Sequence, residues 1–230
     1  SRKVLKAMYD YLKENGVEIL FNIDIREIKT EANRATGLID RQGRNFEGNY
    51  VVLAPGREGS PWLAEQAEKL GLSMAINPVD IGVRVEIPAD IMAHLTDEVF
   101  EAKFIFYSRT FEDKVRTFCM CPRGEVVLEH NDGIVTVNGH SHAERKTNNT
   151  NFAILVSKNF THPFKDPISY GKYIANLANL LGGGVIVQRL GDLKRGRRST
   201  PERIVKGLVT PTLRDATPGD LSLVFPYRHL

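Results

Sequence analysis

Two cysteines in the middle of the chain are the residues whose type and spacing most clearly suggest chemistry. Cys119 and Cys121 stand two positions apart, so they could act as a redox pair or as soft metal ligands. A metal site would need further ligands at fixed spacing, and the nearest candidates are His140 and His142. A histidine pair is a weak signal, so we expect no metal site. The simplest interpretation of the cysteines is a structural role in a strand.

The same spacing bears on a disulfide between the two cysteines. In a regular strand the Cα atoms of Cys119 and Cys121 would lie about 6.5–7 Å apart, at the limit that a disulfide tolerates. We therefore expect both thiols to be free, as in a reduced protein of the cytoplasm.

A dense basic run, Lys194-Arg195-Gly196-Arg197-Arg198, is the second feature. It could hold a nucleotide phosphate, an acidic substrate or RNA. No aromatic residue alternates with these cations, so base stacking is not indicated. We expect the run to be exposed, since four cations without acidic partners cost too much to bury. Replacing Arg197 and Arg198 with serine is then expected to change the free energy of unfolding by about 0.5 kcal/mol at most.

The composition is that of an ordinary globular protein. Of 230 residues, 42 % are hydrophobic and 26 % are charged, which excludes intrinsic disorder. The net charge of +3 implies no general attraction to nucleic acid or anionic membranes. No apolar run reaches the roughly 20 residues that span a bilayer, and we expect no signal peptide. We expect a cytoplasmic protein without a membrane partner. Both ends look cut, so we expect a longer protein.

Apolar spacing predicts the elements of the first 75 residues. Apolar residues at helical spacing begin at Val4 and end at Gly16, and Ser60 followed by Pro61 is typical of a helix start. A polar turn at residues 41–44 joins two strands. The second helix is expected to end at residues 70–71. The expected strands cover residues 17–21, 24–29, 36–40, 45–47 and 50–53, the last buried on both faces.

After a boundary near residue 75 the pattern changes to alternating strands, which favour an antiparallel sheet. Asp166 and Pro167 open a strong helix that Gly182 ends. The fold class is therefore α+β or mixed α/β, with a mainly antiparallel sheet in the second part. The expected strands cover residues 81–87, 103–107, 115–120, 125–128, 134–137, 152–156 and 185–187.

The order of elements before residue 60 resembles the middle of the FAD-binding domain of glutathione-reductase-like flavoproteins. The resemblance implies that Val17–Ile25 is a strand of a parallel sheet, whose last residues, Asp24 and Ile25, bring backbone amides to the adenine. It also implies that Ala54-Pro55-Gly56 approaches the dinucleotide, because small residues let the backbone come close. This chain departs from the family pattern at Pro55, where a threonine is usual.

The second part strengthens the likeness, through segments that occur in a fixed order. These are residues 116–124, 137–141, 151–156, 191–193 and 218–221. The whole chain resembles uncharacterised FAD-dependent dehydrogenases, a branch of the NAD(P)/FAD-dependent oxidoreductases with an inserted substrate domain. The resemblance implies part of an FAD-binding domain at 1–75, a substrate domain at 76–220 and a return segment at 221–230. Candidates on the substrate side, with no catalytic residue assigned, are Arg116, Cys119, Cys121 and His140.

The phosphate loop Gly-x-Gly-x-x-Gly is the part of the family pattern that this sequence lacks. The cluster Gly182-Gly183-Gly184 follows a helix and precedes a strand, whereas the loop needs the reverse order, so we interpret it as a helix stop. The resemblance implies FAD in the full-length protein, with NAD(P)H as a possible co-substrate and a small-molecule substrate. We expect FAD to be absent from this chain alone.

Two other functions compete with the dehydrogenase. One is a flavin-dependent tRNA-modifying protein, and the other is a non-catalytic module that binds nucleic acid or an acidic partner through the basic run. The near-neutral charge makes a nucleic-acid partner the less favoured expectation. The first 60 residues are expected to expose apolar faces and to favour self-association.

Overall fold

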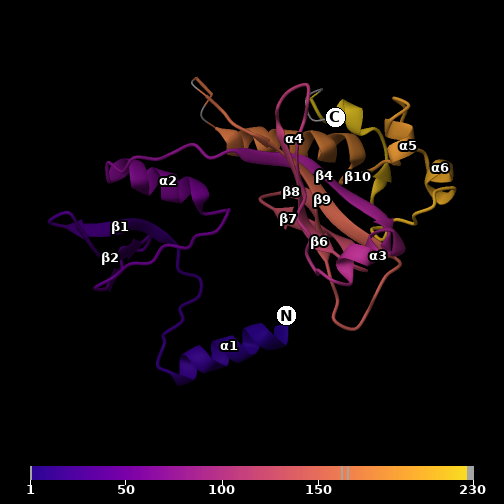
Figure 1. The fold of residues 1–230 in the computed structure, drawn as a ribbon. Coiled ribbons are helices and arrows are strands. Elements are labelled where there is room, and N and C mark those ends of the chain that lie inside the picture. Colours follow the sequence, from indigo (N-terminus) through magenta and orange to yellow (C-terminus); the bar gives the residue numbers. More distant parts are fainter. Residues whose placement is uncertain (1, 162, 165, 227–230) are drawn as a thin grey trace. The chain divides into compact units, whose positions relative to one another are not determined.

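The computed structural model describes residues 2–161, 163–164 and 166–226. They form two compact units, residues 1–74 and 75–230, which we call unit 1 and unit 2. The fold is mixed α/β with mainly antiparallel sheets, as predicted (Figure 1). Within the described residues, no helix is long and apolar enough to cross a membrane.

Unit 1 is a small antiparallel sheet with two helices. The sheet has the order β1-β2-β3, and the polar turn predicted at residues 41–44 joins its last two strands. Asp40 fixes this turn, because its buried carboxylate accepts hydrogen bonds from the amides of Gln42 and Arg44 at 2.9 and 2.8 Å. The elements are α1 (Arg2–Glu14), β1 (Ile25–Glu31), β2 (Arg34–Asp40), β3 (Asn45–Glu47) and α2 (Ser60–Lys69).

Two predicted strands of unit 1 are absent. Residues 17–24 and 50–53 have no strand conformation, so the predicted strand Val17–Ile25 and the buried strand before Ala54 are both wrong. The side chains of Tyr50 and Val52 are each 89 % exposed. A short apolar run becomes a strand only where another strand offers a hydrogen-bonding edge, and none pairs with these runs among the described residues. The helix α1 is present, but none of its residues is buried.

A buried glutamine joins α2 to the edge of the sheet. Gln66, 2 % exposed, accepts a hydrogen bond from the Ile28 amide at 3.1 Å and donates to the Arg26 carbonyl at 3.3 Å. Trp62 donates to the same carbonyl at 2.9 Å. The side-chain amide thereby takes the place of a neighbouring strand, and it satisfies the polar backbone of the edge strand β1.

Replacing Gln66 with alanine is expected to destabilise unit 1 by about 1–3 kcal/mol, because the part-buried Ile28 amide loses its acceptor while the Arg26 carbonyl keeps Trp62 as a donor. Amide hydrogen exchange should show the loss most strongly at Ile28. The exposed Glu68 of the same helix provides the control, and its alanine variant should change stability by about 0.5 kcal/mol or less. Equal protection of Ile28 in both variants would contradict this role of Gln66.

Unit 2 is built on a four-stranded antiparallel sheet with the order β4-β9-β6-β5. A separate hairpin, β7–β8, and a short parallel pair, β10–β11, complete its strands. Each strand predicted in this part is present, with ends that differ by a few residues, whereas the helices α3, α5 and α6, the 3-10 helix η1 and the strand β11 were not predicted. The strands are β4 (Val79–Pro88), β5 (Ile105–Tyr107), β6 (Lys114–Cys121), β7 (Glu125–Asn131), β8 (Ile134–His140), β9 (Asn149–Lys158), β10 (Ile186–Val187) and β11 (Thr217–Pro218). The helices are α3 (Ala89–Thr96), α4 (Pro167–Gly182), α5 (Leu190–Leu193), α6 (Pro201–Val205) and the 3-10 helix η1 (Leu221–Leu223).

The helix α4 begins and ends where the sequence predicts. The Asp166 carboxylate accepts a hydrogen bond from the Ser169 amide at 2.9 Å, and Gly183 ends the helix with a φ of +63°. The helix packs beside β4, β8 and β10 (Figure 1). Its Ile174 lies in the buried core with Ile81 of β4.

The C-terminal segment also packs onto unit 2. Val224 is 3 % exposed and belongs to the same core cluster. The Thr212 hydroxyl donates to the Glu86 carboxylate at 2.6 Å and accepts from the Val126 amide at 2.8 Å. Residues 221–226 thus pack with unit 2 in the structure. The functional assignment of segments 1–75, 76–220 and 221–230 remains a prediction, and residues 227–230 lie outside the described residues.

Candidate functional site

The predicted cofactor turn of unit 1 is exposed and tightly folded. Ala54, Pro55 and Gly56 are all exposed, and Gly56 has a φ of +70°. A Cβ atom at Gly59 would lie 2.4 Å from the Pro55 Cβ atom, so this turn requires glycine there as well. The turn leads directly into Ser60, where α2 begins after Gly59 as its N-cap. An exposed backbone with small residues is open to close approach by a ligand.

The other predicted cofactor residues lie at the start of β1. Ile25 is the first residue of that strand and pairs with Asp40, while the exposed Asp24 carboxylate lies 2.5 Å from Arg41 Nε. Among the described residues, no hydrogen bond or ion pair joins either residue to the 54–56 turn. An open hollow on the sheet is lined by other residues, Lys29, Glu31, Arg34, Ala35, Thr36, Glu47, Gly48 and Asn49.

The described residues fit only part of an FAD site. Gly182, Gly183 and Gly184 follow the C-terminal end of α4, as the sequence predicts, and Gly183 caps that end. The partial charge at a helix C-terminus is negative, so this cluster does not suit a pyrophosphate. The exposed 54–56 turn is compatible with a dinucleotide backbone contact. The described residues thus include a turn that is open to a backbone contact, whereas the Gly182–Gly184 cluster does not suit a phosphate site.

The two cysteines of unit 2 come together at a β-bulge. The register of β6 against β9 shifts between Phe118 and Cys121, and Cys119 has a φ of +47°, which is rare for a residue with a side chain. The Sγ atoms of Cys119 and Cys121 lie 3.9 Å apart, and both cysteines are free, as predicted. The predicted regular strand is wrong at this point, because the bulge re-aims the first cysteine.

Arg84, which sequence reasoning missed, lies against this pair. Its Nη2 donates to the Cys119 carbonyl at 2.6 Å and lies 3.7 Å from Cys121 Sγ, and its Nε donates to Asn151 Oδ1 at 2.9 Å. This half-buried guanidinium has no carboxylate partner among the described residues. Asn151 is fully buried, and its Nδ2 has no hydrogen-bond partner among the described residues. We call Arg84, Cys119, Cys121, Asn138 and Asn151 the cysteine cluster.

The β7–β8 hairpin covers this cluster. A Cβ atom at Gly139 would lie 1.9 Å from Arg84 Nη2 and 2.5 Å from Asn151 Oδ1, so only glycine allows the hairpin to come this close. The neighbouring Asn138 places its Oδ1 3.9 Å from Cys119 Sγ. The alternation of apolar and polar residues along β4 did not predict that Arg84 contacts the cysteines, because an arginine at that position is equally typical of a solvent-exposed face.

The other two substrate-side candidates have different partners. Arg116 Nη2 forms an ion pair with Asp80 at 2.5 Å, and its guanidinium lies 4.8 Å from the Phe118 ring centroid. His140 is exposed and packs against the edge of the His142 ring at a centroid distance of 4.5 Å. The structure thus brings Cys119 and Cys121 together, but it holds Arg116 and His140 in separate interactions.

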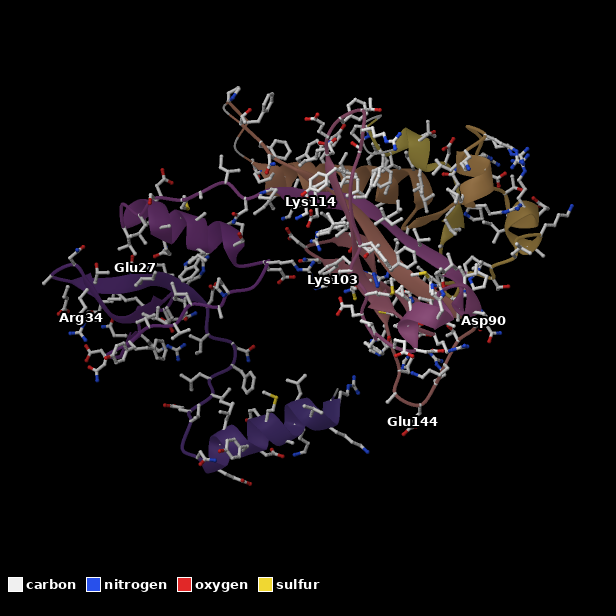
Figure 2. The ribbon with its side chains drawn as sticks, viewed as in Figure 1. Glu27, Arg34, Asp90, Lys103, Lys114 and Glu144 are labelled. Atoms are coloured by element: carbon white, nitrogen blue, oxygen red, sulfur yellow. The ribbon has the colours of Figure 1, made fainter. Side chains whose placement is uncertain are left out.

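His142 belongs to a polar cluster at the end of the β7–β8 hairpin. Its Nε2 lies 2.6 Å from one Glu125 oxygen, and Arg145 Nη2 lies 2.5 Å from the other. The hydrogen bond from His142, followed by the charge of Arg145, holds the pKa of Glu125 below its usual value. Glu144, in the loop to β9, points away from the sheet (Figure 2). Over the part of the chain that the structure describes, no three His, Cys, Asp or Glu side chains gather as metal ligands.

Unit 2 is expected to lose stability at acidic pH. Burial alone would raise the pKa of Asp80, but hydrogen bonds from Ser157 and Arg116 together lower it, and the pKa of Glu125 is lowered too. A carboxyl with a lowered pKa in the folded state stabilises the fold above its unfolded pKa, and this contribution is lost as pH falls through the folded value. The melting temperature should therefore decrease when the pH is lowered below about 4. The Glu125→Gln variant should show a weaker fall, and an unchanged acid profile would contradict this account.

The basic run is exposed as predicted, but one of its cations has an acidic partner. Arg197 Nε lies 2.8 Å from the carboxylate of Asp192, which is 1 % exposed and also accepts from the Ser199 hydroxyl at 2.9 Å. Burial opposes the charge of this carboxylate, but the bonds from Arg197 and Ser199 hold the pKa of Asp192 below its usual value. The expectation of four cations without acidic partners is therefore wrong for Arg197.

Because of this ion pair, replacing Arg197 and replacing the neighbouring Arg198 are expected to have different effects on stability. Arg197→Ser is expected to lower the melting temperature by several degrees, because a buried carboxylate loses its cation. Arg198→Ser removes an equal charge from an exposed position and should leave the melting temperature nearly unchanged. Calorimetry of the two variants side by side is the test, and equal melting temperatures would show that Asp192 does not depend on this ion pair.

Comparison with known proteins gives a family and a relative. The family described as "FAD-dependent protein, C-terminal domain-like" matches residues 78–228. An uncharacterized protein of Clostridium beijerinckii (strain ATCC 51743 / NCIMB 8052) is 27 % identical over 215 residues, covering 86 % of this chain and 40 % of the relative. The chain therefore spans less than half the length of this curated relative.

Proposed function

Because the chain belongs to the family of FAD-dependent proteins with this C-terminal domain, we propose that it is part of a flavoprotein oxidoreductase. The family match over residues 78–228 is the observation that carries the proposal. In the intact enzyme the flavin would accept or donate a hydride, and the protein would bind and orient both cofactor and substrate. The match favours neither the tRNA-modifying protein nor the non-catalytic binding module.

In this proposal unit 1 contributes backbone contacts to the dinucleotide. The exposed Ala54-Pro55-Gly56 turn supports this role, since its small residues and the positive φ of Gly56 leave the backbone open. Asp24 and Ile25 would lie near the adenine, as the glutathione-reductase-like resemblance implies. Unit 2 would bind a small-molecule substrate, with a nicotinamide cofactor as the co-substrate.

An FAD titration followed by flavin fluorescence tests the cofactor contacts. Backbone contacts without a phosphate loop should give a Kd of about 100 µM, or roughly 5.5 kcal/mol. The Gly56→Val variant should weaken binding about tenfold or more, because it places a side chain on the turn that FAD approaches. Gly43→Val is the matched control, since Gly43 has a φ of +81° with open space around it but lies in the hairpin turn of the sheet.

The titration distinguishes FAD binding at the 54–56 turn from FAD binding elsewhere. Weakened binding in Gly56→Val alone supports the contact at the turn, whereas equal binding by both variants and the wild type would place FAD elsewhere. Adding RNA at low salt tests the competing nucleic-acid module, and we expect no mobility shift. A salt-dependent shift would favour that module.

A further inference from the structure

We propose that Cys119 and Cys121 form a redox-active dithiol, which a low-molecular-weight disulfide oxidises to an intramolecular disulfide. The proposal concerns the cysteine cluster of unit 2 and does not depend on the flavin. Four observations carry it: the distance between the sulfur atoms, the β-bulge, the charge of Arg84, which has no carboxylate partner among the described residues, and the difference in exposure between the two cysteines.

The bulge places the two sulfur atoms close together without joining them. The Sγ atoms lie 3.9 Å apart, and one residue, Met120, separates the cysteines. A loop this short gains little stability from cross-linking, because closing it removes little entropy from the unfolded chain. The positive φ of Cys119 adds local backbone strain. A disulfide at this position would therefore be easily reduced, as exchange-active disulfides are.

The charge of Arg84 favours a thiolate and opposes a metal ion. Its Nη2 lies 3.7 Å from Cys121 Sγ, and the guanidinium has no carboxylate partner among the described residues. A half-buried cation without a counter-ion stabilises a negative charge next to it. The same cation would repel a soft metal ion bound to the two sulfurs. The buried Asn151, the register partner of Cys121, adds to this polar environment an Nδ2 donor that has no partner in the described part of the chain.

The two cysteines differ in exposure, which assigns their roles. Cys119 is partly exposed, so an external disulfide can reach it, whereas Cys121 is 5 % exposed. Burial, and next the neighbouring Cys121, raise the pKa of Cys119, while the charge of Arg84 acts in the opposite direction. Its greater exposure makes Cys119 the attacking cysteine, through the fraction that is deprotonated despite the raised pKa, and Cys121 is the resolving one.

The exchange balances in two steps. The Cys119 thiolate attacks a disulfide RSSR, forming a Cys119–SR mixed disulfide and releasing RS⁻. The Cys121 thiolate then attacks the Cys119 sulfur, forming the Cys119–Cys121 bond and releasing the second RS⁻. The two thiols of the protein lose two electrons to RSSR, and their two protons pass through solvent to the released thiolates. In the reverse reaction, Cys121 leaves as a thiolate next to Arg84.

Oxidised glutathione, a small disulfide, is the probe for the full 230-residue chain. After reduction and removal of the reductant, mass spectrometry should find the intramolecular disulfide in the wild type. Cys121→Ser should stop at a Cys119 mixed disulfide with one glutathione, because the resolving thiol is gone. Cys119→Ser should stay unmodified over the same time, because Cys121 is buried. Equal modification of both variants, or no disulfide at any glutathione ratio, would overturn the proposal.

Arg84→Met tests the counter-ion separately. It should slow reduction of the disulfide by glutathione about tenfold, because the leaving Cys121 thiolate loses its neighbouring charge. Arg84→Lys should restore part of the rate. Arg123→Met is the control, since it removes a cation two residues from Cys121 that forms an exposed ion pair with Asp90 at 3.1 Å. Equal slowing by both methionine variants would overturn the role of Arg84, and stoichiometric zinc or copper bound to the reduced wild type would overturn the dithiol assignment.

Discussion

Replacing Ile174 with alanine is expected to lower the free energy of unfolding of unit 2 by about 3 kcal/mol. Ile174 is 6 % exposed and packs with Ile81 and Val224 in the buried core. Truncation removes buried methyl groups and leaves a cavity between α4, β4 and the C-terminal segment. Because β4 also carries Arg84, this core holds the strand on which the cysteine cluster depends.

The control for this prediction lies on the same helix. Ile168 is 54 % exposed, so its alanine variant should lose less than about 1 kcal/mol. Urea unfolding followed by hydrogen-exchange mass spectrometry separates the amides of unit 2 from those of unit 1. Similar losses in the two variants would mean that the core around Ile174 does not limit the stability of this unit.

The purified chain is expected to be colourless. In proteins that bind a dinucleotide, a glycine loop and a helix N-terminus neutralise the pyrophosphate, and no such loop exists among the described residues. With a Kd near 100 µM, flavin at about 1–10 µM would occupy roughly a tenth of the protein or less. The visible absorbance of the preparation measures this occupancy. A yellow preparation with one flavin per chain would mean that unit 2 holds the cofactor, and the site at the 54–56 turn would be wrong.

Unit 1 has exposed apolar residues that are relevant to its expected self-association. No residue of α1 is buried, and Tyr50 and Val52 are almost fully exposed. These exposed side chains fit the expected self-association through the first 60 residues, which remains a prediction that a sedimentation experiment can test.

The sequence predicted those helices and strands whose formation depends on residues close together in the chain. Alternation predicted the strands of unit 2, and the Asp166 cap with Pro167 predicted the start of α4, because these features act within a few residues. The apolar runs at 17–21 and 50–53 carry the same signal as a buried strand, yet both lack strand conformation. Their conformation depends on a pairing edge elsewhere in the protein, which a local pattern does not contain.

The candidate site was predictable only in part for a related reason. The spacing of Cys119 and Cys121 indicated the right pair, but the bulge that brings their sulfur atoms close together results from the pairing of β6 with β9. Arg84 reaches the pair from β4, on the other side of β9, so its role depends on sheet order. The partner of Arg197 was missed although Asp192 lies nearby in sequence, because burial of that carboxylate depends on how the segment folds.

Hydrogen exchange of the chain with and without FAD tests the central claim, that unit 1 supplies dinucleotide contacts of an FAD-dependent protein. At about 1 mM FAD, roughly ten times the expected Kd, most chains are occupied. The account predicts slower exchange in peptides that contain residues 24–25 and 54–56, with no change in the basic run at 194–198. Slower exchange confined to residues 75–226, or no change in any peptide, would contradict it.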